Sequence, residues 1–362
     1  MIMLTITLLN YIGFLIGGII VALIVNKLLL QFSTTLGIRN KNDVFVRWSN
    51  QSKPSLGGVS FFVVFFCVFI AYAFIYSQED NIFANKEFVG LLLGGSIAFA
   101  MGLSDDAYNT KPLFKLFIQV LSGFIVAYFG MTINLTPYIA LNYVITIFWV
   151  VVLMNSLNML DNMDGITAIV VMFILLSCLS IKFFFDGYVI DVWTVILIAQ
   201  IGGLIGFLYY NVNPSKLFMG DAGSQFIAFF VAFFSIKYLW NGATQVYDAS
   251  PLNGLLICFV AFTPAFADTM TVIINRLRRG QSPMVGGKDH TTHHLVYYGL
   301  KDIQVWYVFL AISAISYVLS TFMFFSKSTN SHFLFVVGPL FTVGVFLTLF
   351  RITQKYKAPE QK

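Results

Sequence analysis

The sequence predicts an all-α fold, a polytopic helical bundle embedded in a membrane. Its 362 residues are 58% hydrophobic and only 10% charged, whereas soluble globular domains carry about 25% charged residues. The apolar residues lie in long uninterrupted blocks, and about 20 such residues are what a helix needs to cross a bilayer. Backbone polar groups in lipid must be satisfied within each segment, so we expect these blocks to be helices.

Eleven blocks predict about eleven transmembrane helices. In order, they cover residues 4–30, 56–76, 88–104, 113–131, 138–158, 166–185, 189–210, 222–240, 252–272, 302–325 and 332–350. The block at 88–104 is short and rich in glycine, which favours tilting or close packing. No internal repeat, low-complexity tract or linker interrupts the series, so residues 1–362 are expected to form a single transmembrane domain.

The placement of Lys and Arg predicts the orientation of the chain. Of its 21 Lys and Arg residues, only Lys86, Lys182, Lys237 and Lys327 lie on the side of the even-numbered loops. Cytoplasmic loops carry the excess of basic residues, so the N-terminus is predicted outside, and the C-terminus and odd-numbered loops in the cytoplasm. The net charge of +5 follows from this bias and requires no nucleic-acid partner. The predicted cytoplasmic loops are 31–55, 104–112, 159–165, 211–221 and 273–301.

Ionisable residues close to membrane depth are rare and informative, and here they gather in five places, all in these cytoplasmic loops. The first is Lys53, which precedes the pair Gly57-Gly58. A lysine before two glycines lets backbone amides approach a phosphate, although a basic loop before a helix gives the same pattern. The second is Asp105-Asp106, followed by Lys115. Adjacent carboxylates repel, which favours a base, a proton-sharing pair or a divalent cation site.

The third place is the most unusual, because Asn155, Asn158, Asp161 and Asp164 recur at every third position at the end of an apolar block. A spacing of three keeps side chains on one broad helix face, so the sequence predicts that they converge on one polar pocket. Amide and carboxylate oxygens suit Mg²⁺ or Mn²⁺, and they can also read a nucleobase. The alternative interpretation is a helix terminus with side-chain caps.

The fourth place holds Phe218 and Asp221 within Phe-Met-Gly-Asp-Ala-Gly-Ser. Asp221 is either a helix N-cap or a metal ligand beside amides that face a diphosphate, and Phe218 could stack on a base. The fifth place is the longest cytoplasmic loop, with several arginines and three of the four histidines. Arginine clamps diphosphates, and histidine serves acid–base or phosphate-binding roles near neutral pH. The residues singled out there are Arg276, Arg279, His290, His293 and His294.

Taken in order, these five motifs resemble the polyprenyl-phosphate N-acetylhexosamine-1-phosphate transferase family, with a match that extends from residue 53 to residue 294. The resemblance implies an enzyme of the cytoplasmic (inner) membrane, with an active site that faces the cytoplasm. Its implied reaction transfers a sugar phosphate from a UDP-N-acetylhexosamine to polyprenyl (undecaprenyl) phosphate and releases UMP. The product would start a lipid-linked glycan for the cell envelope, such as O-antigen or a wall polymer. Mg²⁺ is the implied cofactor, with Mn²⁺ as an alternative, membrane lipid surrounds the enzyme, and a homodimer is left open.

The resemblance also implies roles for individual residues. Asp221 and Asn158 match metal-site positions, and Asp105 and Asp106 match an acidic pair that handles the lipid phosphate. Lys115 matches a phosphate-binding lysine, Asp164 and Phe218 match positions near the uracil, and Arg276, Arg279, His290, His293 and His294 match the loop that holds the diphosphate and sugar. Asp161 is placed with the catalytic residues, and Lys53 and Asn155 with those that bind substrate.

Two branches of the family are distinguishable by sequence. The muramoyl-pentapeptide branch of peptidoglycan synthesis carries three consecutive histidines and looks ten-helical, whereas this chain has His290-Thr-Thr-His293-His294 and eleven blocks. Asp268 is similar to an aspartate found in the GlcNAc branch, so GlcNAc-1-phosphate is the favoured group. A different intramembrane prenyltransferase would not need the basic histidine loop. A transporter would place its polar residues near the bilayer midplane, often with repeat symmetry.

Overall fold

The computed structural model describes residues 2–32, 53–76, 81–242, 250–283, 286–326 and 333–357, and within these ranges the regular structure is helical. Most of the predicted loop 31–55 lies outside the described residues. The helices follow one another as α1 (Ile2–Phe32), α2 (Val59–Ile75), η1 (Ile82–Ala84), α3 (Lys86–Tyr108), α4 (Pro112–Tyr128), α5 (Ile139–Leu160), α6 (Ile166–Asp186), α7 (Val192–Asn211), α8 (Gly220–Phe234), η2 (Ser235–Trp240), α10 (Pro251–Ala261), α11 (Thr263–Arg278), α12 (Thr291–Tyr297), α13 (Asp302–Ser326) and α14 (Leu334–Lys355).

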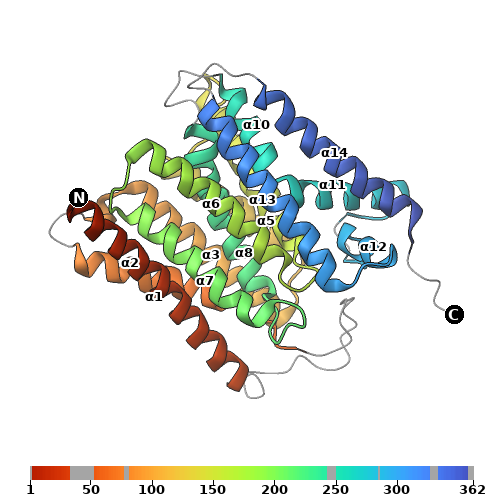
Figure 1. Ribbon diagram of the computed structural model, residues 1–362, viewed down its shortest axis with the longest axis horizontal. Helices are drawn as coiled ribbons and strands as arrows, with labels where there is room; N and C mark the ends of the chain where they lie inside the picture. Colours follow the sequence, from red (N-terminus) through yellow and green to blue (C-terminus); the bar gives the residue numbers. More distant parts are fainter. Residues whose placement is uncertain are drawn as a thin grey trace.

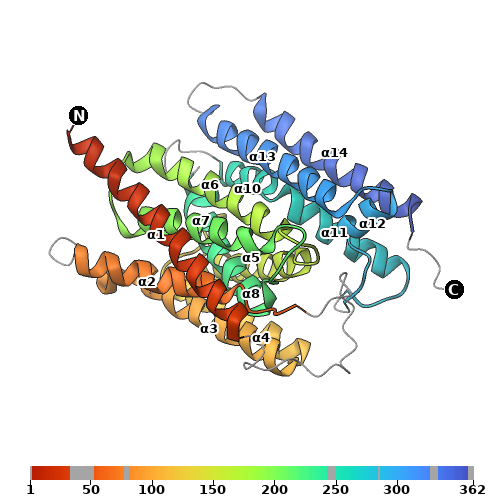
Figure 2. The ribbon, with the colours of Figure 1, turned by 60° about the horizontal axis from the view of Figure 1, so that its bottom comes forward.

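The helices are arranged in three parts that follow the chain order (Figures 1 and 2). Helices α1 to α4 form one side of the bundle, α10 to α14 form the other, and α5 to α8 lie between them. The apolar stretch formed by α8 and η2 is 94% buried and that of α7 is 83% buried, against 17% for α1 and for α14. The core is therefore built around α7 and α8, and the outer helices present side chains such as Leu9, Ile24 and Leu340 outward, where lipid would meet them.

The predicted membrane bundle is confirmed. In the part of the chain that the structure describes, eight helices are long and apolar enough to cross a membrane, and the bent pair α10–α11 adds a ninth span. The shorter apolar helices Val59–Ile75 and Pro112–Tyr128 fill the second and fourth predicted blocks. Each of the eleven blocks therefore contains a helix.

The ninth predicted block is the clearest departure from expectation. In place of one straight helix over 252–272, α10 and α11 meet at an angle of 82°. Pro264 stands in the first turn of α11. A proline has no N–H to donate, and its ring clashes with the carbonyl four residues earlier, so α10 cannot continue through it. A second departure is η2, where the predicted helix over 222–240 changes to π-helical hydrogen bonding.

Close contacts between glycines and backbone bring the ends of α2, α3 and α8 together. A Cβ on Gly102 of α3 would lie 2.6 Å from Ala222 Cα, and a Cβ on Gly58 would lie 2.8 Å from Met219 O. Only glycine permits such an approach of helix to backbone. The carboxyl end of α3 therefore meets the amino end of α8, and the residues Asp105-Asp106 lie in the last turn of α3 rather than in a loop.

Candidate active site

Three carboxylates meet where α3 ends and α8 begins. Asp105 is fully buried, is paired with Lys115 of α4, and accepts hydrogen bonds from the backbone N–H and the hydroxyl of Thr110 at 2.7 and 2.8 Å. Asp221 lies within hydrogen-bonding distance of Asp105, and the charge of Asp106 acts on Asp221 as well. We call Asp105, Asp106 and Asp221 the acidic cluster. Lys115, which was predicted to contact a phosphate, compensates one of its charges.

Asp106 also has a structural task at the start of α8. Its Oδ2 accepts a hydrogen bond from the backbone N–H of Ala222 at 2.9 Å, so a carboxylate from α3 caps α8 and favours the positive end of its dipole. Asp221 was considered as the N-cap, but it lies inside the first turn, and the N-cap position is Met219, which makes no side-chain cap. The Asp221 side chain is therefore not used in capping α8.

The oxygens beside α8 suit a divalent cation. Ser224 donates to Asn158 Oδ1 at 2.9 Å and to the backbone carbonyl oxygen of Asp221 at 3.4 Å, which brings the end of α5 next to the first turn of α8. Among the described residues, no three His, Cys, Asp or Glu side chains form a ligand set by themselves. Mg²⁺ does not require one, because it binds through one or two carboxylates, substrate phosphates and water. A cluster of three carboxylates with one lysine also leaves negative charge for a cation to balance.

The polar residues at the end of α5 reach different elements. Asn155 donates from Nδ2 to Gln119 Oε1 of α4 at 2.7 Å, whereas Asn158 contacts Ser224 of α8. Helix α5 ends at Leu160. Asp161 and Asp164 lie beyond this end, so the helical spacing that predicted a common face does not apply to them. Asn155 and Asn158 therefore connect α5 to two different helices, and their hydrogen bonds do not lead into one pocket.

Asp161 and Asp164 follow the end of α5. Asp161 is the half-buried C-cap residue. Asp164 accepts from the backbone N–H of Ser215 at 3.0 Å, from its hydroxyl at 2.8 Å and from Asn213 Nδ2 at 3.4 Å. The carboxylate that was predicted to lie near a uracil thus shapes the loop between α7 and α8.

Lys53 and Phe218 lie together in that same region. Lys53 Nζ donates to Ser215 Oγ at 3.3 Å and lies 5.4 Å from the centre of the Phe218 ring. Backbone hydrogen bonds from Phe218 N to Pro54 O and from Gly57 N to Phe218 O, both at 2.9 Å, fix the two segments side by side. A lysine and an aromatic ring from distant parts of the sequence are therefore adjacent, as a phosphate and base site would require.

The two arginines differ in how many of their N–H donors are already used within the protein. Buried Arg276 donates from Nε and Nη2 to the carboxylate of Asp289 at 3.0 and 2.7 Å, and from Nη1 to Pro283 O at 2.8 Å. Half-exposed Arg279 makes one contact to the same carboxylate, at 2.6 Å. Burial alone would raise the pKa of Asp289, but the hydrogen bonds and charge of Arg276, with His290 and Arg279, lower it to about 2. Arg276 therefore anchors the loop, and Arg279 is the better placed to meet a diphosphate.

The three histidines are buried at the start of α12. His290 Nδ1 lies 2.9 Å from Asp268 Oδ2, and Asp268 Oδ1 accepts from the backbone and hydroxyl of Thr291 at 2.8 and 2.6 Å. Burial lowers the pKa of His293 to about 3, and it also lowers the pKa of His294. His293 and His294 are therefore neutral near pH 7, which suits a hydrogen-bonding role better than a charged one.

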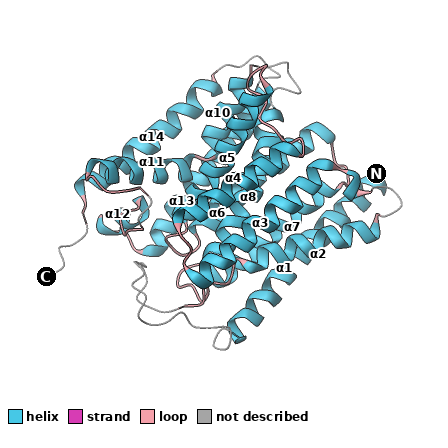
Figure 3. Ribbon diagram, turned by 180° about the vertical axis from the view of Figure 1, so that it is seen from behind, coloured by secondary structure: helices cyan, strands magenta, loops and turns pink. Residues whose placement is uncertain are grey.

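The segment that follows α5 connects the separate parts of the site. Thr292 donates its hydroxyl to Asn162 Oδ1, which ties the histidine helix to the end of α5. Asn211 accepts from Gly165 N at 2.9 Å and donates to Leu217 O at 2.8 Å, which ties in the loop before α8. The short helix α12 and the loops after α5 and α7 gather at one end of the bundle, as Figure 3 shows from behind.

Several polar residues of this region were not predicted as site residues. The main ones are Gln119, Asn211, Ser215, Gln225, Asp268, Asp289 and Thr292. Gln119 and Gln225 are fully buried amides in apolar helices, and polar residues at membrane depth are the signal that could have identified them. Ser215 and Thr292 carry no such signal, because loop hydroxyls are common.

Fold and site together define a polytopic helical membrane protein with acidic, amide, arginine and histidine side chains at one end of its bundle. The comparisons with known proteins agree with the motifs. A family model described as glycosyl transferase family 4 matches residues 88–239, from the start of α3 to η2, and this range holds the acidic cluster and the end of α5. The predicted resemblance is therefore confirmed.

Curated relatives span most of the chain. The probable undecaprenyl-phosphate N-acetylglucosaminyl 1-phosphate transferase of Bacillus subtilis is 25% identical over 278 residues, which cover 74% of this chain and 73% of the relative. The decaprenyl-phosphate N-acetylglucosaminephosphotransferase of Mycolicibacterium smegmatis is 24% identical, with 84% and 80% covered. The phospho-N-acetylmuramoyl-pentapeptide-transferase of Wolinella succinogenes is 28% identical, with 51% and 59% covered.

Proposed function

We propose that this protein transfers N-acetylhexosamine-1-phosphate, in the first instance GlcNAc-1-phosphate, from a UDP-sugar to polyprenyl phosphate. A phosphate oxygen of the lipid attacks the β-phosphorus of the UDP-sugar. The bond from that phosphorus to the bridging oxygen breaks, and UMP leaves with this oxygen. The product is a polyprenyl diphosphate sugar. In the cell this product would start a lipid-linked glycan of the envelope, made at the cytoplasmic membrane with the active site facing the cytoplasm.

The observation that carries the proposal is the joining of the acidic cluster to the arginine and histidine loop through the end of α5. Asn158 contacts Ser224 beside Asp221, and Asn162 accepts from Thr292 beside His293. Carboxylates for a cation thus lie at the same end of the bundle as Arg279 and the histidines. Phosphoryl transfer depends mainly on positioning and charge neutralisation, and these groups supply both. The names of the curated relatives support the same reaction class.

In this proposal Asp221 and Asn158 would hold Mg²⁺, which when bound neutralises charge on the donor diphosphate. Lys53 and Phe218 bind the uridine end, with Asp164 shaping the loop beneath them. Arg279 binds the diphosphate, and Arg276 and Asp289 hold it in place. His293 and His294, neutral near pH 7, donate or accept hydrogen bonds at the sugar phosphate. Asp106, Lys115 and Asp105 lie where the lipid phosphate would approach.

A muramoyl-pentapeptide donor is the second candidate, since relatives of that name align over about half of this chain. The interrupted histidine pattern favours the simpler donor. His290 is engaged with buried Asp268, and Nδ1 of His294 lies at the carbonyl oxygen of Tyr356, so the histidines are not arranged as three equivalent groups.

The test uses the full-length protein purified in detergent with undecaprenyl phosphate, Mg²⁺ and a panel of radiolabelled UDP-sugars, including UDP-GlcNAc, UDP-GalNAc and UDP-N-acetylmuramoyl-pentapeptide. Label entering the lipid phase and release of UMP are followed together, with an EDTA control. We expect EDTA-sensitive transfer from UDP-GlcNAc with one UMP per product. Transfer from the pentapeptide donor alone would show that the protein acts as a muramoyl-pentapeptide transferase instead. A folded sample that uses none of the donors would overturn the proposal.

A further inference from the structure

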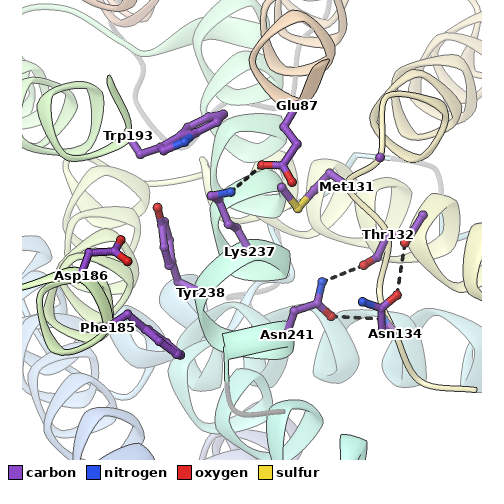
Figure 4. Close-up of a pocket in the computed structure, with 11 residues that line it drawn as sticks. Glu87, Met131, Thr132, Asn134, Phe185, Asp186, Trp193, Lys237, Tyr238 and Asn241 are labelled. Atoms are coloured by element: carbon purple, nitrogen blue, oxygen red, sulfur yellow. Dashed lines mark hydrogen bonds and ion pairs between the residues drawn. The ribbon is translucent and has the colours of Figure 1, made fainter. Parts of the chain in front are cut away.

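A second polar region lies at the opposite end of the bundle from the acidic cluster. A cavity of about 450 Å³ is bounded there by α3, the α4–α5 connection, α6, α7 and η2 (Figure 4). Glu87 on its wall stands in the first turn of α3, and Asp105 stands in the last. At 1.5 Å per residue the two are separated by about 27 Å along the helix. The cavity is thus remote from the proposed transfer site, and its volume is in the range of small-ligand pockets.

The ammonium groups of Lys237, on the cavity wall, and of Lys182, behind it, are already paired with carboxylates. Lys237 Nζ donates to Glu87 Oε2 at 2.5 Å and lies 4.6 Å from the centre of the Trp193 ring. Lys182 is fully buried and donates to Asp186 at 2.9 Å and to Asp191 at 2.7 Å. The cavity lining itself therefore carries two carboxylates, Glu87 and Asp186, and one ammonium group, Lys237, while Lys182 and Asp191 offset each other behind it, which leaves one negative charge in excess on the wall.

The exposed part of the excess charge lies on the cavity wall. The Asp186 side chain is 46% exposed, whereas that of Lys182 is fully covered. In Figure 4 the Asp186 carboxylate points toward Tyr238, with Phe185 below and Trp193 above. A carboxylate among aromatic rings is the arrangement that binds organic cations, because ring faces and carboxylate oxygens both attract positive charge.

The opposite wall is held by a fixed backbone. Asn241 donates from Nδ2 to Thr132 O at 2.7 Å, and its Oδ1 accepts from Asn134 N at 3.1 Å. The π-helical turns of η2 carry Lys237 and Tyr238 on the cavity wall, and Asn241 follows as the C-cap residue of η2. Irregular helical turns of this kind are frequent at functional sites. The cavity is therefore a built feature of the fold.

We propose that this cavity binds a ligand through an ammonium group, held by Asp186 and the surrounding rings. The inference does not rest on the proposed transfer reaction. A small soluble amine and the ethanolamine headgroup of a phospholipid share this chemistry, and the experiment separates them. Inorganic phosphate or another anion would meet the excess negative charge and is expected not to bind.

The test measures melting temperature and ligand retention by native mass spectrometry on the full-length protein. In the soluble arm the probe is ethanolamine, with glycerol as the uncharged control and inorganic phosphate as the anionic control. In the lipid arm the protein is placed in bilayer discs of phosphatidylethanolamine or of phosphatidylglycerol. Variant Asp186→Asn removes the carboxylate, and Asp302→Asn removes a carboxylate in the first turn of α13, which does not line this cavity. A further variant, Asn134→Lys, adds an ammonium group at an exposed position of the wall.

We expect saturable stabilisation of the wild type by ethanolamine or by the ethanolamine lipid. A hydrogen bond to a charged group is strong enough that Asp186→Asn should weaken the affinity by about tenfold or more. Asn134→Lys should weaken it by repulsion, and Asp302→Asn should leave it unchanged. Stabilisation by the lipid alone would identify the ligand as the phospholipid headgroup. Stabilisation by both probes would show that the cavity binds amines in general. Unchanged affinity in folded Asp186→Asn and Asn134→Lys, or stabilisation by phosphate in place of the amine, would overturn the inference.

Discussion

Asp221 is the residue on which the proposed chemistry depends most. Its carboxylate is free of the capping role that Asp106 performs for α8, yet it is held among Asp105, Asp106 and the backbone of α3. Holding a carboxylate beside two other carboxyl groups at a closely packed helix contact costs folding free energy unless a cation balances the charge. This is the physical argument for the cation-binding role that we propose for Asp221.

We therefore predict that Asp221→Asn lowers transfer of sugar phosphate by about 10² fold or more, the effect of removing a main electrostatic group from a site. The change replaces the carboxyl group by an amide of the same size, so the melting temperature should stay about the same. Asp186→Asn, at the other end of the bundle, is the matched control and should keep full activity. Undiminished activity of purified Asp221→Asn would reject its metal role.

His293 gives the histidine helix a pH dependence. Burial lowers its pKa to about 3, whereas an unfolded histidine titrates near 6.5. Between these values the unfolded chain binds more protons than the folded one, so stability is full above pH 6.5 and is lost as the pH falls toward 3. One such group contributes at most about 1.4 kcal/mol per pH unit.

The expected result is a melting temperature that declines from pH 7 to pH 5, with a shallower decline in His293→Gln. His294 shifts in the same direction, so part of the slope should remain in that variant. Asp289, with a pKa of about 2, titrates below this window and does not interfere. Equal slopes for the variant and the wild type would show that His293 is not buried as a neutral group.

Arg276 and Arg279 show what a sequence pattern can predict about a basic residue and what it cannot. Arg276 and Arg279 look equivalent in the sequence, because both are basic residues at the end of an apolar segment. The structure separates them, since Asp289 and Pro283 use the donors of Arg276 and leave Arg279 half-exposed. A pattern gives the type of charge at a position, whereas the partner is decided by which segments the fold brings together.

Helices were the most predictable elements, because the length of an apolar block and the thickness of a bilayer determine them almost alone. Their interruptions were not predicted. The 82° bend between α10 and α11 and the π-helical turns of η2 lie within blocks whose average hydrophobicity is unbroken. Pro264 was visible in the sequence as a signal for the bend, but nothing in the composition of 235–240 distinguishes a π-helix from an α-helix.

Three helices are joined by amides behind the acidic cluster. Gln119 of α4 accepts from Asn155 of α5 at 2.7 Å and donates to Gln225 Oε1 of α8 at 3.2 Å. Gln119 and Gln225 are fully buried, so water cannot replace a lost partner. This amide chain fixes α4 and α5 against the helix that carries Asp221.

We predict that Gln119→Leu and Gln225→Leu each destabilise the protein by about 1–3 kcal/mol, the cost of leaving a buried polar partner unsatisfied. The double variant should lose less than the sum of the two, because residues in one network couple. Melting temperatures of the four proteins in one detergent measure this cycle. Strictly additive losses would mean that the two glutamines act independently.

At the scale of the whole molecule, the two ends of the bundle differ in chemistry as well as in charge. The transfer site, with its loops and histidine helix, lies at one end, and the aromatic cavity with Lys182 and Lys237 lies at the other. The basic residues gather at the first end, which predicts that it faces the cytoplasm. A soluble UDP-sugar donor made in the cytoplasm requires the same orientation. One measurement of the orientation therefore tests both the predicted topology and the proposed function.

Cysteine labelling tests this orientation directly. Cys178 and Cys258 are buried and Cys67 lies on an apolar helix, so the wild type should react little with a membrane-impermeant maleimide. Lys288→Cys and Tyr188→Cys place thiols at exposed positions of opposite ends. In intact cells we expect labelling of Tyr188→Cys only, and in inverted membrane vesicles of Lys288→Cys only. The reverse pattern would put the transfer site outside the cell, away from any cytoplasmic UDP-sugar, and would contradict the proposed reaction together with the predicted topology.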